Sequence, residues 1–408
     1  MRDACEETAP LAGIRVTDFT WAWAGPHGTQ LLALLGAEVI KIESGTRLDH
    51  SRLRSLMAGS VQGGPDESPI FNDLNLNKLS LTLNLRKPEA RDIVRRLVAV
   101  SDVVAQNMRP GVLDRLGLGY EDLSAVKPDI VMLSSSAVGA AGPERAYAGY
   151  APTFASLSGA AYLTGHPDGP PVPLSGSVDL RVGTAGAFAV LAALYHRQRT
   201  GEGQHIDLSS TEVMSALIGE AFVGYSMTGR IPERLGNRHE SLAPHGCYRS
   251  KREGEWVSIA VGSDEEWAAL ARVIGDAALL EPAFGAAQRR HESQDLLDER
   301  IESWTQKRDP DDVVDTLQRA GVAAMRVRSG ENITHDPHVR ARDVMQRVEH
   351  PRLGEKQVVG PPWRFSDGGV GIRHAAPLLG EHNRYVLGEI LGLSETEIDQ
   401  LHRSGVTE

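Results

Sequence analysis

Short apolar runs alternate with amphipathic segments of helix length along the first third of the chain. Strands are expected for five runs rich in Val, Ile and Leu, at residues 13–19, 37–43, 78–85, 102–107 and 129–136. Helices are expected between them at 25–36 and at 87–101, the second with Pro88 in its first turn. Strands that alternate with helices in this way predict an α/β fold with a mostly parallel sheet and helices on both faces.

A long helix with few bulky side chains is predicted after Asp179. Residues 182–194 are mostly Gly, Ala and medium-sized apolar residues, a composition typical of close backbone packing. Arg197 and Arg199 suit the negative end of the helix dipole, and Gly201 is a stop signal. Asp179 is therefore predicted to be the N-cap, with its ionised form favoured by the free N–H groups of the first turn. A capping role and a nucleophilic role both remain open from these residues alone.

The second half of the chain predicts a smaller α/β module. A Gly-, Pro- and Arg-rich connector at 229–250 follows a helical segment at 212–227 and indicates a domain boundary. Beyond it we expect, in chain order, a strand at 255–263, helices at 264–275, 294–307 and 309–321, a strand at 322–328, and a final helix pair capped by Ser394. The expected domains are 1–225, 226–340 and 341–408. A long polar segment at 43–69 is a candidate functional loop.

Composition narrows the class of protein. The 408 residues carry a formal net charge of −11 and two cysteines, Cys5 and Cys247. The acidic balance argues against a nucleic-acid partner, because phosphate contacts need a basic surface. The two distant cysteines offer neither a disulfide framework nor a zinc cluster. The first 13 residues lack the apolar core of a signal peptide, and we expect no run that spans a bilayer. These features predict a cytoplasmic protein without a metal or a membrane partner.

Several motifs, taken together, resemble the class III CoA-transferase family, which includes formyl-CoA and carnitine CoA-transferases and α-methylacyl-CoA racemases. They lie in order at residues 13–43, 74–85, 105–123, 196–209, 242–250 and 379–394. The resemblance implies a Rossmann-like large domain that binds CoA, a small inserted domain, a C-terminal segment that returns to the large domain, and an interlocked homodimer. It also implies that Asp179 attacks the thioester of an acyl-CoA. An aspartyl anhydride and then an aspartyl-CoA thioester would carry CoA to an acceptor carboxylate, and a carboxylate can form both species.

Candidate CoA contacts follow from the same resemblance, position by position. Ala22 and Trp23 lie in the loop after the first strand, where the family places residues near the adenine and the active centre. Lys78 matches a family lysine near the CoA phosphates, and an exposed lysine at a strand end is its alternative. Asn107 and Met108 end a strand on the side where open α/β sheets bind ligands.

Two arginines are candidates for the CoA phosphates. Arg115, on the helix after Asn107, has the charge and the position for this contact. Ser44 stands where formyl-CoA transferases carry an arginine. Arg47 is a candidate substitute for that arginine, with a solvated side chain as the alternative.

The acyl and acceptor side departs from the best-known members of the family. Trp21 and Tyr150 are the candidate substrate residues. Tyr150 matches a position that is Tyr in oxalate-using transferases and His in racemases, and Ala151 replaces the Glu of the oxalate enzymes. The missing Glu argues against oxalate, and a Tyr of ordinary pKa is a poor acid or base for racemisation. A packing role for Tyr150 remains open.

The small residues after Asp179 are expected to form the acyl pocket. Gly183, Thr184 and Gly186 would leave room for an acyl group against the backbone. The leading prediction is therefore an acyl-CoA:carboxylate CoA-transferase. An α-methylacyl-CoA racemase or epimerase and a CoA-binding subunit of a hetero-oligomeric transferase are the alternatives.

Overall fold

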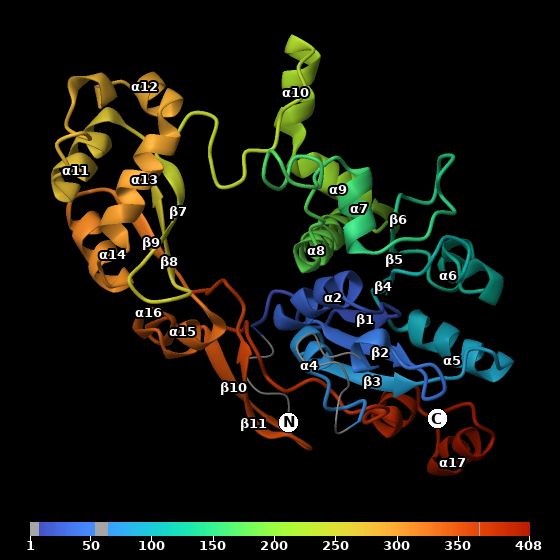
Figure 1. Cartoon of the computed structure of the whole chain (residues 1–408). Coiled ribbons are helices and arrows are strands. Elements are labelled where there is room, and N and C mark those ends of the chain that lie inside the picture. Colours follow the sequence, from blue (N-terminus) through green and yellow to red (C-terminus); the bar gives the residue numbers. More distant parts are fainter. Residues whose placement is uncertain (1–7, 54–63, 367) are drawn as a thin grey trace. The chain divides into compact units, whose positions relative to one another are not determined.

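A six-stranded parallel sheet lies at the centre of the larger of two structural units (Figure 1). The computed structural model describes residues 8–53, 64–366 and 368–408. In spatial order the strands are β3 (Lys78–Thr82), β2 (Glu38–Glu43), β1 (Arg15–Asp18), β4 (Val103–Gln106), β5 (Val131–Ser136) and β6 (Gln204–Ser209), each parallel to its neighbours. The order reverses between β1 and β4, the switch point at which doubly wound sheets bind ligands. The predicted α/β class is confirmed.

Five of the six strands largely bury both of their faces, whereas the edge strand β6 exposes Gln204, His205 and Asp207. Successive side chains point to opposite sides, so Val104 and Met132 enter one apolar core while Val103 and Val131 enter another. The first core includes α5 (Pro88–Ala99) and α6 (Tyr120–Val126), and the second includes α2 (Ala24–Leu34) and α8 (Gly176–Thr200). The other helices of this unit are α3 (His50–Leu53), α4 (Pro69–Leu74), η1 (Asp114–Leu116), α7 (Ala151–Leu157), α9 (Ser210–Leu217) and α10 (Gly219–Thr228).

Helix α8 is long and apolar enough to cross a membrane by length and composition alone, which corrects the expectation that no run of the chain passes this test. In the structure α8 packs against α2, α7, α9, β5 and β6. Core helices of this length pass the same test, and 44% of its apolar window is buried. We therefore describe α8 as the central helix of this unit, and its end at Gly201, with φ of 78°, is as predicted.

The C-terminal segment belongs to the same unit as the sheet. It contains the antiparallel hairpin of β10 (Met345–His350) and β11 (Gly354–Val359), which the sequence pattern did not indicate. The π-helix η3 (Tyr385–Ile390) and α17 (Glu395–Arg403) follow. Their residues Val386, Leu387 and Ile398 pack into the core on the α5 side. Ser394 caps α17 as predicted, by accepting a hydrogen bond from the Glu397 N–H.

The second unit has its own sheet and its own core. Strands β7 (His245–Arg249), β8 (Trp256–Ala260) and β9 (Ala323–Val327) form an antiparallel sheet. Its helices are α11 (Asp264–Ile274), η2 (Pro282–Gly285), α12 (Ala287–Glu292), α13 (Gln294–Thr305), α14 (Pro310–Arg319), α15 (Gly330–His335) and α16 (Pro337–Ala341). Strand β7 lies inside the stretch 229–250, so the C-terminal end of that predicted connector is part of the module.

The two units are built from separate stretches of the chain. One contains Met1–Ala161, Pro173–Met227 and Arg342–Glu408, and the other contains Tyr162–Val172 and Thr228–Ala341. The predicted division at residues 225 and 340 remains a prediction about domains. The short stretch Tyr162–Val172 was not part of it. Cys5 and residues 54–63 of the polar segment 43–69 lie outside the described residues.

Candidate active site

The loop between β1 and α2 lies at the carboxyl edge of the large sheet and is held by side chains from three other elements. Asn107, just after β4, accepts from the Trp21 N–H at 2.7 Å and donates to the Trp21 carbonyl at 2.8 Å. Ala22 follows in a left-handed conformation with φ of 66°, and its N–H donates to Asp49 Oδ1 at 2.9 Å. The backbone of this loop is therefore fixed immediately before α2 begins at Ala24.

The Asp179 carboxylate lies at the N-terminus of α2, and Asp179 is not the N-cap residue of its own helix. Helix α8 begins at Gly176, so Asp179 occupies its first turn and Ser175 is the residue at the N-cap position. The half-buried carboxylate accepts a hydrogen bond from the Ala24 N–H. The predicted N-cap role is thus wrong in one respect, because Asp179 caps the neighbouring helix.

Burial raises the pKa of Asp179 to about 6, and the Ala24 N–H opposes this shift. The expectation that the helix end simply favours the ionised form is corrected, because removing the carboxylate from water outweighs one hydrogen bond. At pH 7 about nine in ten molecules still carry the carboxylate. A carboxylate that is ionised yet poorly solvated is a better nucleophile than one on the surface.

Glycines bring α2 and α8 close enough for this contact. A Cβ on Gly28 would lie 2.7 Å from the Gly183 carbonyl oxygen, and a Cβ on Gly183 would lie 2.4 Å from the Ala24 carbonyl oxygen. The close packing predicted from composition is confirmed. The predicted acyl pocket is wrong for two of its three residues, because Gly183 contacts α2 and a Cβ on Gly186 would lie 3.1 Å from Leu133.

Thr184 is the member of that predicted pocket that stays exposed. Its hydroxyl donates to the Leu180 carbonyl at 2.8 Å and lies 3.4 Å from His27 Nε2. Burial, and secondarily the charge of Lys78, lower the pKa of His27 to about 4. The imidazole beside Thr184 is therefore neutral at physiological pH.

The pKa of Asp179 gives a pH dependence that kinetics can test. If Asp179 is the nucleophile that the family resemblance implies, attack needs its carboxylate, and kcat/KM for the acyl-CoA should fall tenfold per pH unit below about pH 6. A stopped assay of CoA transfer between pH 4.5 and 8 measures this limb. A profile that stays flat to pH 4.5 would show that Asp179 titrates like a surface aspartate.

The two tryptophans of this loop, Trp21 and Trp23, contact different parts of the structure. The Trp21 ring packs edge-on to His50 with 6.2 Å between centroids, and the Arg47 guanidinium lies 5.1 Å from the Trp21 centroid. Arg47 is thus brought to the predicted site by a cation–π contact. The Trp23 ring lies against Gly176 at the start of α8, 3.4 Å from where a Cβ would be. The Trp23 ring therefore connects this loop to the first turn of α8, which carries Asp179.

Lys78 lies in the interior, which corrects the alternative of an exposed lysine at a strand end. Its side chain is fully buried and pairs with Asp18 Oδ2 at 3.1 Å. The ammonium also donates to the Pro26 carbonyl at 2.9 Å, to Thr29 Oγ1 at 2.8 Å and to Asn75 Oδ1 at 3.0 Å. Three ammonium protons with four acceptors leave no donor for a phosphate in this structure. Burial lowers the pKa of Lys78 to about 8, and the charge of Asp18 opposes the shift.

Arg115 is exposed in the short helix η1 after β4, at the carboxyl edge of the sheet. Met108 lines a cavity of about 220 Å³ that Gly111 and Asp114 also border. The exposed Arg115 guanidinium lies beside Gly111, 3.1 Å from where a Cβ of that residue would be, whereas the Lys78 ammonium is buried. Of the two basic residues predicted to contact CoA, the geometry favours Arg115.

The two cations can be compared in matched variants. Arg115→Met should raise KM for acyl-CoA about tenfold and leave kcat and the melting temperature unchanged, because it removes one exposed phosphate contact. Lys78→Met should lower the melting temperature by several degrees, since it leaves Asp18 buried without its cation. Steady-state kinetics and thermal melts measure both effects. The reverse pattern would mean that Lys78 contacts the ligand.

Tyr150 precedes α7 and its side chain is 65% exposed. The Tyr150 N–H donates to Thr153 Oγ1 at 3.0 Å, so the backbone holds the residue at the helix N-terminus. The packing role that the sequence left open is wrong for this structure. Contact with the acceptor stays a prediction.

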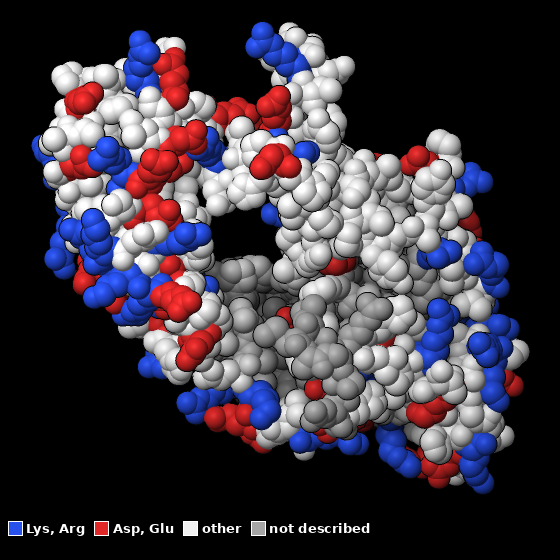
Figure 2. All heavy atoms as spheres, viewed as in Figure 1, with Lys and Arg blue, Asp and Glu red and all other residues white. Residues whose placement is uncertain are grey.

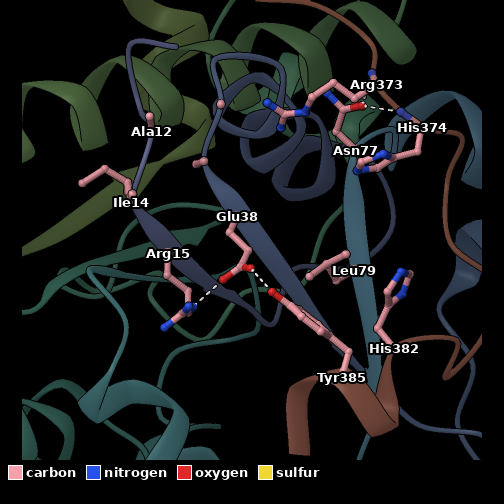
Figure 3. Close-up of a pocket in the computed structure, with 13 residues that line it drawn as sticks. Ala12, Ile14, Arg15, Glu38, Asn77, Leu79, Arg373, His374, His382 and Tyr385 are labelled. Carbon is pink, nitrogen blue, oxygen red and sulfur yellow. Dashed lines mark hydrogen bonds and ion pairs between the residues drawn. The ribbon is translucent and has the colours of Figure 1, made fainter. Parts of the chain in front are cut away.

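Figure 3 shows residues that line another cavity of the sheet-containing unit. It encloses about 600 Å³ at the amino ends of β1, β2 and β3. Glu38 in its wall accepts from Tyr385 Oη at 2.8 Å and pairs with Arg15 at 2.5 Å. Because open parallel sheets bind ligands at the carboxyl ends of their strands, we assign the reaction to the opposite edge, where Asp179 lies.

Sequence reasoning missed the buried charges behind the loop. Lys41 and Asp49 pair at 3.0 Å with at most 2% of either side chain exposed. Lys41 also donates to the Thr20 carbonyl at 2.6 Å. Lys41 lies between Ile40 and Ile42 in the predicted strand 37–43, and this was the available signal, because a charge in a buried strand needs a partner.

The family of the chain is identified by comparison with known proteins. The sequence model of CoA-transferase family III matches residues 11–383. The chain belongs to CoA-transferase family III. It is 35% identical to succinyl-CoA--D-citramalate CoA-transferase of Chloroflexus aurantiacus over 97% of this chain and 98% of that one. It is 31% identical to mouse succinyl-CoA:glutarate CoA-transferase over 99% of this chain and 92% of that one.

Two further relatives bear on assembly and fold. The chain is 33% identical to the beta subunit of succinyl-CoA--L-malate CoA-transferase of Chloroflexus aurantiacus, over 99% of this chain and all of that subunit. The crystal structure of a CAIB/BAIF family protein from Brucella suis superposes with a TM-score of 0.85 at 32% identity, covering 94% of this chain and 99% of that one. Membership of this family makes the protein a CoA-transferase that acts on CoA thioesters and carboxylates. Among the described residues no cluster of His, Cys, Asp and Glu could hold a metal ion.

Proposed function

We propose that this family III CoA-transferase moves CoA from succinyl-CoA to a dicarboxylic acid, with Asp179 as the nucleophile. The observation that carries the proposal is the half-buried Asp179 carboxylate at the N-terminus of α2, with its pKa raised by burial. Support for the substrates comes from relatives whose names pair succinyl-CoA with citramalate, malate or glutarate, all of them dicarboxylic acids.

The reaction is a series of four acyl transfers through Asp179. One carboxylate oxygen attacks the thioester carbonyl of the donor, and the C–S bond breaks to give a mixed anhydride and the CoA thiolate. The thiolate attacks the aspartyl carbonyl and releases succinate, which leaves an aspartyl-CoA thioester. The acceptor carboxylate attacks this thioester, which gives a second mixed anhydride and releases the CoA thiolate. The thiolate then attacks the acceptor carbonyl of that anhydride. The new acyl-CoA leaves and the Asp179 carboxylate is restored, with no net proton transfer.

The chain supplies groups that suit this sequence of steps. Each step passes through a tetrahedral oxyanion, and a fixed backbone N–H stabilises such charge without moving. The Ala24 N–H that donates to the resting carboxylate lies beside the aspartyl carbonyl on which two of the oxyanions form. In every step the nucleophile and the leaving group are a carboxylate and a thiolate, so no general base is needed. The chain agrees with this, because the lowered pKa of His27 makes it a weak base and the Tyr150 side chain is exposed.

A donor and acceptor screen tests the function. The purified chain is incubated with succinyl-CoA, acetyl-CoA or benzoyl-CoA and with citramalate, malate or glutarate, and the new acyl-CoA is measured by liquid chromatography. We expect succinyl-CoA to be at least tenfold better than the other donors in kcat/KM, and no transfer from Asp179→Asn. Equal rates with all donors, or transfer by the variant, would contradict the proposal. Activity of the isolated chain also separates a complete enzyme from a subunit.

We further propose that the active form is a homodimer, interlocked as the family resemblance implies, through an apolar surface on α8 and α10. Helix α10 has no buried residue, and its Phe222, Tyr225 and Met227 are 52%, 53% and 78% exposed. Phe188 of α8 is 73% exposed. Figure 2 shows this side of the unit largely free of Lys, Arg, Asp and Glu. Exposed apolar surfaces rich in aromatic residues usually mark an interface.

Charge introduced on this surface should separate the subunits. Phe188→Glu and Phe222→Glu together should shift the protein from dimer to monomer in light scattering after size exclusion. Val126→Glu, which places a charge on an exposed apolar position of α6, should leave the mass unchanged. A double variant that remains dimeric would place the interface elsewhere.

A further inference from the structure

We propose that the buried Lys41–Asp49 pair positions the nucleophile's hydrogen-bond donor: it holds the left-handed turn at Ala22 and so directs the Ala24 N–H at Asp179. This inference rests on the proposed role of Asp179 as the nucleophile. It assigns a function in the reaction to two residues that touch neither CoA nor the reacting atoms. We therefore call Lys41 and Asp49 positioning residues.

The pair holds the loop at two successive points. Lys41 donates to the Thr20 carbonyl at 2.6 Å, and Asp49 Oδ1 accepts from the Ala22 N–H at 2.9 Å. The other oxygen of Asp49 lies 3.0 Å from Lys41 Nζ, so the two buried charges neutralise each other. Asp49 Oδ1 also accepts from the Ser51 N–H at 2.9 Å, which orients the carboxylate from its own side.

The contact at Ala22 matters because its conformation is costly. A residue with a Cβ at φ of 66° is in a sparsely populated region, and strain of about 1–3 kcal/mol persists only where surrounding contacts fix it. Without the acceptor at Asp49, the chain at Ala22 would relax toward negative φ. A change of φ there would reorient the next two peptide groups, and the second of them carries the Ala24 N–H.

Other side chains fix the residues on both sides of this turn, so only the turn at Ala22 depends on the Lys41–Asp49 pair. Asn107 holds both backbone groups of Trp21, and Lys78 donates to the Pro26 carbonyl in the first turn of α2. Residues 21 and 26 are therefore anchored on the two sides of Ala22 and Ala24. The Lys41–Asp49 pair fixes the stretch between these anchors.

No neighbouring charge sets the pKa of Asp179, so the Lys41–Asp49 pair can alter that pKa only through the position of the Ala24 N–H. Helices α2, α7 and α9 and strands β5 and β6 pack against α8, and their titratable or charged residues include His27, Glu212, His205 and Asp207. None of them contributes to the pKa of Asp179 in the structure, which is set by burial and by the Ala24 N–H. His27 is neutral above pH 5, because its pKa is lowered to about 4.

Two neutral double variants isolate the hydrogen bond at Ala22. Lys41→Met with Asp49→Asn keeps an amide oxygen for the Ala22 N–H, whereas Lys41→Met with Asp49→Leu has a similar volume and cannot accept. Both remove the buried charges, so neither leaves an unpaired ion in the core. Steady-state kinetics of the full-length protein from pH 4.5 to 9 give kcat, KM for succinyl-CoA and the acid limb of the profile.

The Asn variant should keep kcat within about threefold and an acid limb near pH 6. The Leu variant should lose about 10- to 100-fold in kcat, the effect of a misplaced donor, with KM little changed. Its acid limb should move upward by half a unit or more, because the N–H that lowers the pKa of Asp179 is turned away. If that variant does not fold, Asp49→Glu carries the test, since it keeps the charge pair and displaces the carboxylate by one methylene. The same upward move is expected.

The outcomes separate this inference from the proposed function. Full activity in Asp179→Asn would overturn the role of Asp179 as the nucleophile, whatever the pair does. If Asp179→Asn is inactive and the Leu variant keeps the wild-type acid limb, the inference is wrong. A fall in kcat with an unmoved acid limb also overturns it, because that result indicates only a structural role.

Discussion

Asp179→Asn is expected to abolish CoA transfer, with kcat reduced about 10⁴-fold or more. The amide keeps the size of the side chain and its acceptor for the Ala24 N–H, but it cannot form an anhydride or an aspartyl thioester. The loss should appear in kcat and much less in the dissociation constant for acyl-CoA, since the substitution removes the reacting atom and no binding contact. Calorimetric titration with CoA and a transfer assay measure the two quantities.

The same substitution should make the protein more stable above pH 6. The folded-state pKa of about 6 lies above the ordinary aspartate value of 3.8, so ionisation favours the unfolded chain. Below pH 3.8 the Asp179 carboxyl is neutral in both states and does not reduce the free energy of unfolding. Above pH 6 it is ionised in both states, and the buried charge reduces the free energy of unfolding by its full amount. The variant should therefore melt at a higher temperature than wild type at pH 8, and at the same temperature near pH 3.5.

A matched aspartate controls for the loss of a charge. Asp92 lies on α5 with its side chain 70% exposed, and it pairs with Arg95 at 2.7 Å. Asp92→Asn should keep transfer activity and leave the melting temperature unchanged at both pH values, because exposed pairs of this kind contribute little. If Asp179→Asn behaved like Asp92→Asn, the carboxylate of Asp179 would have no special role.

Gly183→Ala is the second substitution with a large expected effect. Its Cβ would lie 2.4 Å from the Ala24 carbonyl oxygen and 2.9 Å from the Gly28 N, both of them backbone atoms that cannot rotate away. Helices α2 and α8 would have to separate, which should destabilise the protein by about 2–3 kcal/mol, in the upper range for overpacking. The separation would also draw the Ala24 N–H from Asp179, so kcat should fall at least tenfold.

Thermal melting and the transfer assay test this prediction together. Gly330→Ala is the control, because Gly330 lies at the start of α15 with nothing within 4 Å of its would-be Cβ. That variant should retain full activity and equal or slightly higher stability, as glycine-to-alanine changes do in helices. A Gly183→Ala protein with wild-type melting and activity would mean that α2 and α8 do not cross this closely.

The fold was largely predictable because five of the six strands of the large sheet bury both of their faces. Local pattern detects them from short apolar segments, such as Val39, Ile40 and Ile42 in the run 37–43 and residues 103–105 in the run 102–107. The hairpin β10–β11 escaped for the opposite reason, since its residues 345–350 and 354–359 are mostly polar and largely exposed. Strand β7 lies among glycine, proline and basic residues, so its pattern was that of a connector.

The site was predictable in its nucleophile but not in its arrangement. The sequence pattern indicated Asp179 as the N-cap, but α8 begins three residues earlier, at Gly176, with Ser175 at the N-cap position. The partner of Asp179 is 155 positions earlier, at Ala24, and follows only from the glycine crossing. Lys78 was predicted to contact CoA from the family resemblance, and its buried acceptors Asp18 and Pro26 are too distant in sequence for local pattern to indicate them.

Chemical trapping of the acyl-enzyme tests the central claim most directly. The protein is mixed with succinyl-CoA, quenched with hydroxylamine or reduced with borohydride, digested and mapped by mass spectrometry. We predict that modification depends on succinyl-CoA, falls on the peptide containing Asp179 and is absent from Asp179→Asn. Modification at another carboxylate, or full CoA transfer with Asp179 left unmodified under trapping conditions, would contradict the account.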